Sequence, residues 1–123
     1  MGIRHRPVLW IIYLNMKILL TREYGAGWST WADRNDVADF VLTYQPIIDY
    51  LEALENAGKD NDLHEKHPLI LKLLKDIKDK FGTDTHFYVG GCKSLYVDDV
   101  HKPSLVEMLR IRDYDGRETL YGY

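Results

Sequence analysis

The sequence is poor in cysteine, in long apolar runs and in excess charge, and each shortage excludes a class of protein. Cys92 is the single cysteine among 123 residues, so no internal disulfide can form and a reducing, cytoplasmic setting is favoured. The longest apolar run, 7–14, is far shorter than the roughly 20 residues that span a bilayer. The net charge of -3 argues against general nucleic-acid binding, which needs a basic surface.

The first fifteen residues differ from the rest of the chain. A basic start at 4–6 precedes the apolar run, yet no small-residue cleavage site follows, as a signal peptide would require. We interpret 1–15 as an N-terminal extension upstream of a natural start at Met16. An extra strand packed on the domain and a targeting segment are the alternatives. The remaining part, 16–123, has the length of one domain.

Apolar spacing predicts one strand and then helices in the first part of this domain. The nearly continuous apolar run at 16–20 is typical of a buried strand. Apolar residues at i, i+3, i+4 and i+7 across 37–44 predict a helix. Pro46 ends or kinks that helix, or opens a second one. The clearest helix spans 68–82, with lysines near its end and a glycine as its cap.

Beyond residue 82 the apolar period changes to two, which is typical of half-buried strands. We expect strands at 86–89, 94–100 and 107–114, and the Asp115-Gly116 pair predicts a tight turn into a last strand at 118–123. The order of strand, helices and strands predicts an α+β fold. We expect one mostly antiparallel sheet of four to five strands with two or three helices on one face.

An unusual loop, TREYGAGWSTW (21–31), follows the first strand. It lacks the lysine that a phosphate-binding loop places after its last glycine. We interpret one ring of Trp28 and Trp31 as an anchor that fastens the loop to the first helix. The other ring, with Tyr24, would be an exposed contact of the kind enriched at protein interfaces. Arg112 and Asp115, in and beside the final hairpin, form a second candidate surface.

Other side chains could carry chemistry, but each has a simpler interpretation. His64 and His67 are three residues apart, not the four of a helical metal pair, and are interpreted as capping residues. Cys92 could be a nucleophile beside a histidine, but no orienting group can be named for it. Asp98 and Asp99 could bind magnesium, yet adjacent strand residues point to opposite faces. We therefore predict no catalytic residue, no bound metal and no cofactor.

Four segments together carry a family resemblance: MKILLTREYGAGWS (16–29), HPLILKLLKDIKDKFG (67–82), SLYVDDV (94–100) and LRIRDYDGRETL (109–120). In this order they are similar to a family of small, uncharacterised phage and prophage proteins. The resemblance covers most of 16–123, whereas the doubled helix at 35–58 departs from the family pattern. Its motifs are structural, so it implies a mobile-element origin but no activity.

These observations lead us to expect a non-enzymatic phage or mobile-element accessory protein of the host cytoplasm. It would act by contact with a host or phage protein through Tyr24, Trp28 and Trp31, and it has no expected membrane span. The first alternative is a nucleic-acid-binding module that uses the tyrosines and arginines of the last strands, which the acidic net charge disfavours. The second is a small metal-dependent hydrolase built on the histidines or on 98–99.

Overall fold

The structure, a computed structural model, describes residues 3–8, 16–100 and 109–121. Within these ranges the chain forms five strands, three α-helices and two short 3-10 turns. Their bounds, in chain order, are β1 (Ile3–Val8), β2 (Met16–Thr21), η1 (Ser29–Trp31), α1 (Asn35–Leu42), α2 (Gln45–Asn56), α3 (Pro68–Phe81), η2 (Gly90–Ser94), β3 (Leu95–Val100), β4 (Leu109–Tyr114) and β5 (Arg117–Tyr121). The predicted α+β class is confirmed.

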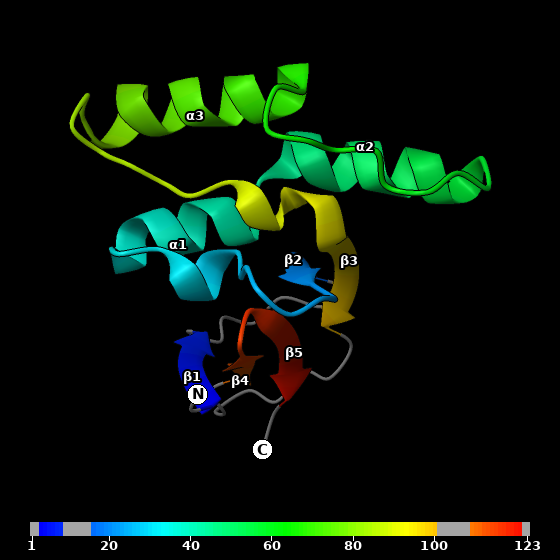
Figure 1. Cartoon of the computed structure of the whole chain (residues 1–123), viewed down its shortest axis with the longest axis horizontal. Coiled ribbons are helices and arrows are strands. Elements are labelled where there is room, and N and C mark those ends of the chain that lie inside the picture. The colour runs from blue at the N-terminus through cyan, green and yellow to red at the C-terminus, as the bar shows by residue number, and fades with distance from the viewer. Residues whose placement is uncertain (1–2, 9–15, 101–108, 122–123) are drawn as a thin grey trace.

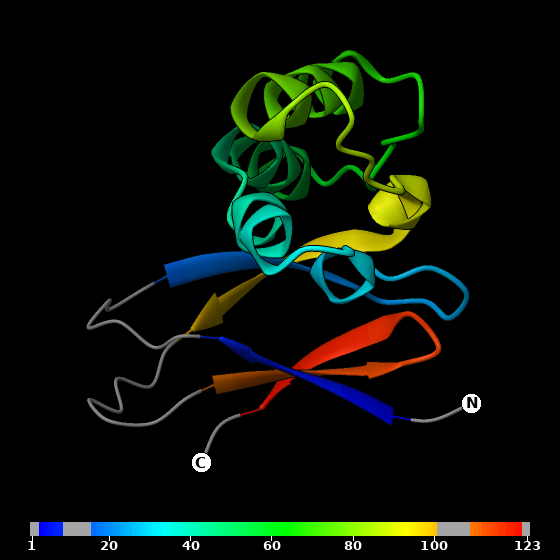
Figure 2. The same ribbon diagram turned by 90° about the vertical axis from the view of Figure 1, so that its left-hand side faces the viewer.

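The strands form two separate antiparallel sheets, and not the single sheet of four to five strands that we expected. One sheet has three strands in the order β1-β4-β5, and the other pairs β2 with β3. Figure 2 shows three layers, with the helices above, β2 and β3 in the middle, and the three-stranded sheet below. The helices thus lie on one side of the strands, as predicted (Figure 1).

Strand β2 is buried on both faces because it lies between the helices and the three-stranded sheet. Leu19 packs in the main core with residues of all three helices. Ile18 and Leu20 point to the other side and pack with Ile111 of β4. This position explains the apolar run at 18–20, since Ile18, Leu19 and Leu20 are fully buried on both faces of the strand.

Strands β2 and β5 are joined by hydrogen bonds that involve side chains, and they share no backbone ladder. The Thr21 N–H donates a hydrogen bond to the Glu118 carboxylate at 3.2 Å. The Thr21 hydroxyl donates to the Gly116 carbonyl. Because these bonds join the two strands at their ends, β2 and β5 are neighbours without sharing one sheet.

The helices begin and end close to the predicted residues. Helix α1 ends at Leu42. Pro46 lies in the first turn of α2, where the N–H that proline lacks would have no partner within the helix. Helix α3 begins at Pro68, is capped by the His67 side chain and ends at Gly82. Of the alternatives predicted for Pro46, the structure therefore shows the one in which Pro46 begins a second helix.

Two parts of the strand prediction change. Residues 86–89 are not a strand. Phe87 is buried against the Trp28 ring, with the centroids 4.9 Å apart, and its neighbours His86 and Tyr88 are exposed. Exposed and buried residues do alternate in this segment, but within the described ranges no strand pairs with it. In contrast, β1 (3–8) pairs along the whole of β4, as the extra-strand alternative expected of part of 1–15. This pairing does not test whether Met16 is the natural start. Residues 1–2, 9–15, 107–108 and 122–123 lie outside the described residues.

Candidate functional site

The loop that follows β2 is fastened to the last hairpin by a buried carboxylate. Glu118 is 0% exposed. One of its oxygens, Oε2, accepts hydrogen bonds from the Trp28 N–H at 2.8 Å, from the Thr30 N–H at 3.0 Å and from the Thr30 hydroxyl. The other, Oε1, accepts from the Thr21 N–H. Burial raises the pKa of Glu118, while the Thr30 hydroxyl and the two backbone donors on Oε2 oppose that shift.

A second buried carboxylate, Asp113 of β4, binds the same loop. The Trp31 indole N–H donates to its Oδ2 at 2.9 Å, and the Gly116 N–H donates to its Oδ1 at 2.6 Å. Asp113 therefore joins the loop to the turn of its own hairpin. Trp31 is half-buried and is held by this bond, so its ring is partly structural and partly accessible.

Trp28 is the anchor of the loop and forms no part of an exposed surface. Its side chain is 0% exposed, and its indole N–H donates to the Val41 carbonyl of α1 at 2.9 Å. The ring also meets Phe87 edge to face. Our inclusion of Trp28 among the surface residues is corrected on this ground: a ring that packs in the core cannot meet a partner.

Tyr24 and Tyr114 form an exposed aromatic pair beside this anchored loop. Tyr24 is 58% exposed and Tyr114 is 47% exposed. Their rings meet edge to face with centroids 6.0 Å apart. The guanidinium of Arg117, which lies opposite Tyr114 in the β4–β5 ladder, is 6.0 Å from the centre of the Tyr24 ring. We call Tyr24, Tyr114 and Arg117 the tyrosine–arginine surface.

The two hairpin residues predicted from sequence lie at the edge of this surface. Arg112 is exposed on β4, two residues before Tyr114 and therefore on the same face of the sheet. Asp115 is half-buried in the turn, with φ 49°, and Gly116 follows with φ 92°. Positive φ at both central residues is the geometry expected for this turn pair. The Asp115 carbonyl accepts from the Gly25 N–H at 2.5 Å, so the turn supports the loop that carries Tyr24.

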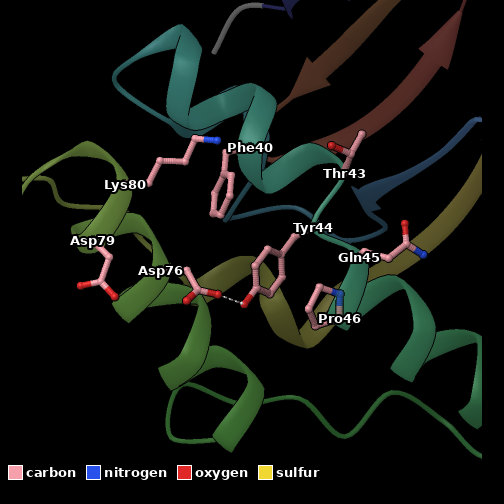
Figure 3. Close-up of a pocket in the computed structure, with 8 residues that line it drawn as sticks. All are labelled: Phe40, Thr43, Tyr44, Gln45, Pro46, Asp76, Asp79 and Lys80. Atoms are coloured by element: carbon pink, nitrogen blue, oxygen red, sulfur yellow. Dashed lines mark hydrogen bonds between the residues drawn. The ribbon is translucent and has the colours of Figure 1, made fainter.

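A cleft of about 570 Å³ lies between the α1–α2 junction and the second half of α3 (Figure 3). Among the residues that line it, the Tyr44 hydroxyl donates to the Asp76 carboxylate at 2.6 Å. The Lys72 ammonium, which is outside the lining, donates to the same carboxylate at 2.8 Å. Burial, followed by the Asp76 carboxylate, raises the pKa of Tyr44 to about 12. Because these polar groups bond to one another, they brace α3 against the junction and offer a ligand few open partners.

The remaining chemical candidates have structural roles. The His67 ring nitrogen accepts from the Leu69 N–H at 3.1 Å, and the His64 ring nitrogen accepts from the Lys66 N–H at 3.2 Å. His67 is thus the N-cap of α3, as predicted, whereas His64 bonds within the loop before it. The described residues contain no group of three or more His, Cys, Asp or Glu that could hold a metal. Cys92 is buried, and burial raises the pKa of its thiol to about 11, which makes it a poor nucleophile.

Tyr88 and Tyr96 do not lie on the sheet face that carries Arg112 and Tyr114. Tyr88 lies outside any strand. Tyr96 belongs to β3, packs between the two sheets with Ile18 and Leu20, and carries the Arg22 guanidinium 4.1 Å from its ring centre. Asp98 and Asp99 are adjacent in β3 and half-buried. The aromatic sheet face imagined for nucleic acid is therefore divided between two sheets.

Sequence reasoning missed Glu118 and Asp113, the two carboxylates that organise the site. A signal was available, because period-two alternation places Asp113 with Ile111 and Glu118 with Leu120 on the inward face of the hairpin. Two acids on an inward face predict buried acceptors, and a glycine-rich loop with many free N–H groups is their natural donor.

No helix in the described ranges is both long and apolar enough to cross a membrane. Comparison with protein-family models, with curated proteins and with solved structures gives no match to this chain.

Proposed function

We propose that this chain is a non-enzymatic protein-binding domain and that the tyrosine–arginine surface is its recognition site. The observation that carries the proposal is the exposure of Tyr24 and Tyr114 side by side, with Arg117 beside them. Tyrosine and arginine are the residue types most enriched at the energetic centres of interfaces, where they supply large contact area and hydrogen bonding together.

The support beneath these side chains favours binding because it orders them in advance. Glu118 fixes the loop after Tyr24 through its bonds to Trp28 and Thr30. The Gly25 N–H to Asp115 carbonyl bond fixes the loop immediately beside Tyr24. Immobilising a flexible side chain on binding costs roughly 0.5–1.5 kcal/mol, and a surface that is already ordered avoids much of that cost.

The proposed partner is a protein of the phage or of its host, met in the host cytoplasm. That origin rests on the sequence resemblance alone. Nucleic acid is the less favoured partner, because a chain of net charge -3 attracts phosphates weakly and Tyr24 and Tyr114 meet edge to face, which does not build a flat stacking platform.

The experiment is capture from host lysate with immobilised wild-type protein and two surface variants, Tyr24→Ser and Arg117→Ser. Leu71→Ser is the matched control: Leu71 is 53% exposed and lies on α3, at the far end of the molecule from the hairpin (Figure 2). We expect one captured protein that both surface variants lose and the control retains, with all four proteins folded by circular dichroism.

Two results would contradict the proposal. Capture that survives both surface variants would place the recognition site elsewhere. Capture of nucleic acid, with affinity that falls steeply as salt rises, would favour the nucleic-acid alternative.

A further inference from the structure

Strand β3 presents a backbone edge on the side away from β2. In an antiparallel pair the N–H and C=O of one residue point to the same side, and successive residues alternate. The Arg22 N–H donates to the Ser94 carbonyl at 3.0 Å, and Leu20 lies opposite Tyr96. Ser94 and Tyr96 therefore face β2, and Val97 faces away from it.

Leu95 is the first residue of β3 whose carbonyl faces away from β2, and this carbonyl already accepts a hydrogen bond from another segment. The Asn61 side-chain amide donates to the Leu95 carbonyl at 3.1 Å and to the Cys92 carbonyl at 3.0 Å. Val97 is the next outward residue. Within the described parts of the chain, the backbone bonds outside helices and ladders include none to Val97, so its outer N–H and C=O are available.

A groove of about 490 Å³ lies beside this edge, between β3 and the C-terminal end of α2, and its size is within the usual range for ligand sites. Its lining is largely polar, with an apolar patch where Leu54 of α2 and Val97 of β3 are half-buried above the buried Leu51 and Leu95. Its rim carries charges of both signs, from Arg22, Glu55, Lys59 and Asp60. An apolar patch beside an open backbone rung suits an extended chain, which offers hydrogen bonds at its edge and a side chain at every second residue.

We propose that this groove binds an extended segment of a protein partner, which adds to β3 as a third strand and places an apolar side chain against Leu51 and Leu54. Charged residues of both signs around that apolar centre would complement the rim. The inference deepens the proposed function and rests on it, because Arg22, which lines the groove, belongs to the same loop as Tyr24, two residues further along the chain.

The probe is a displayed library of random nonapeptides, selected on the folded wild-type protein and then measured as free labelled peptides. We expect selected peptides rich in strand-forming residues around one apolar position. The Val97→Pro variant should bind them at least tenfold more weakly, because proline removes the outward N–H; an edge strand tolerates proline where that N–H faces away from its neighbour. Val97→Thr keeps the N–H and the β-branch and should bind like wild type.

Amide hydrogen exchange on the wild-type protein gives an independent readout that requires no variant to fold. Bound peptide should slow exchange at Val97, while Tyr96, already in the β2–β3 ladder, should change little. The proposal is overturned if no peptide is selected, if Val97→Pro binds as well as wild type, or if protection falls on another element. A concentration-dependent dimer that protects Val97 without peptide would also overturn it, by assigning the edge to a second copy.

The two proposals fail in different ways. If Tyr24→Ser and Arg117→Ser lose the natural partner but Val97→Pro keeps it, strand addition is wrong and the recognition surface stands. If none of the three variants affects capture, both proposals are wrong.

Discussion

Replacing Glu118 by alanine would remove the acceptor on which the loop after β2 depends. Three backbone N–H groups, those of Thr21, Trp28 and Thr30, donate to this carboxylate, and the Thr30 hydroxyl is a fourth donor. The methyl side chain of alanine has no oxygen that could accept these hydrogen bonds. Glu118, Thr21 and Trp28 are fully buried, so water does not readily replace the bonds of Thr21 and Trp28, whereas Thr30 is half-buried.

The magnitude follows from the number of donors left without a partner. Each buried N–H that loses its acceptor costs about 1–3 kcal/mol. Removal of a buried carboxylate, which burial itself disfavours, offsets part of that cost. We therefore expect Glu118→Ala to lower the free energy of unfolding by about 4 kcal/mol, a large share of the roughly 5–15 kcal/mol that holds a domain together. Thr30→Val removes only the hydroxyl donor and should cost about 1 kcal/mol.

The assay is urea unfolding followed by tryptophan fluorescence, which the buried Trp28 makes sensitive to loss of the core. Glu23→Ala is the matched control, because Glu23 belongs to the same loop and is exposed; it should leave the unfolding midpoint unchanged. If Glu118→Ala unfolds at the same urea concentration as Glu23→Ala, the Glu118 carboxylate does not anchor the loop.

Three further predictions concern pH, the thiol and the hairpin turn. Burial raises the pKa of Glu118 above its ordinary value of 4.5, so the folded state binds that proton more tightly than the unfolded state. The stability of wild type relative to Glu118→Gln should therefore be greatest below about pH 4.5 and fall as pH rises through the raised pKa; the opposite slope in urea titrations would contradict this. Cys92 should resist a thiol reagent at pH 8 until the protein unfolds, and rapid labelling of folded protein would show that its burial is incomplete. Gly116→Ala should destabilise the protein by about 2 kcal/mol more than Gly25→Ala. Both glycines have positive φ, but only at Gly116 would an added Cβ collide with the Ala26 backbone, at 2.5 Å. Equal melting temperatures of the two variants would refute the collision.

The helices could be predicted from the sequence because their signals are local. Pro46 and Pro68 open helices, and Gly82 ends one, through backbone chemistry that needs no distant partner. The turn at 115–116 is local in the same sense. The number of sheets was not predictable in this way, because period two shows that a strand has two faces but does not name its neighbour.

The candidate site was only partly predictable for a related reason. The pattern placed Tyr24 and the hairpin correctly as surface features, and it proposed that one tryptophan is an anchor without deciding which. That choice depends on Val41 and Phe87, which contact Trp28 only in the folded chain. The predicted strand at 86–89 was wrong because its alternation reflects one buried ring, that of Phe87, between two exposed neighbours. It does not reflect pairing with another strand.

The carboxylate of Glu118 also has a consequence for the order of folding during synthesis. It bonds to Thr21, 97 residues earlier in the chain, so strand β2 and its loop emerge from the ribosome long before their acceptor exists. Helices α1 to α3 can form as they appear, whereas the N–H groups of the loop stay hydrated until β5 has been made. Such distant closure is slow and leaves apolar surface uncovered meanwhile. A nascent chain stalled before β4 should therefore expose Ile18 and Leu20 on the side that Ile111 later covers, and should depend on chaperones more than the released protein does.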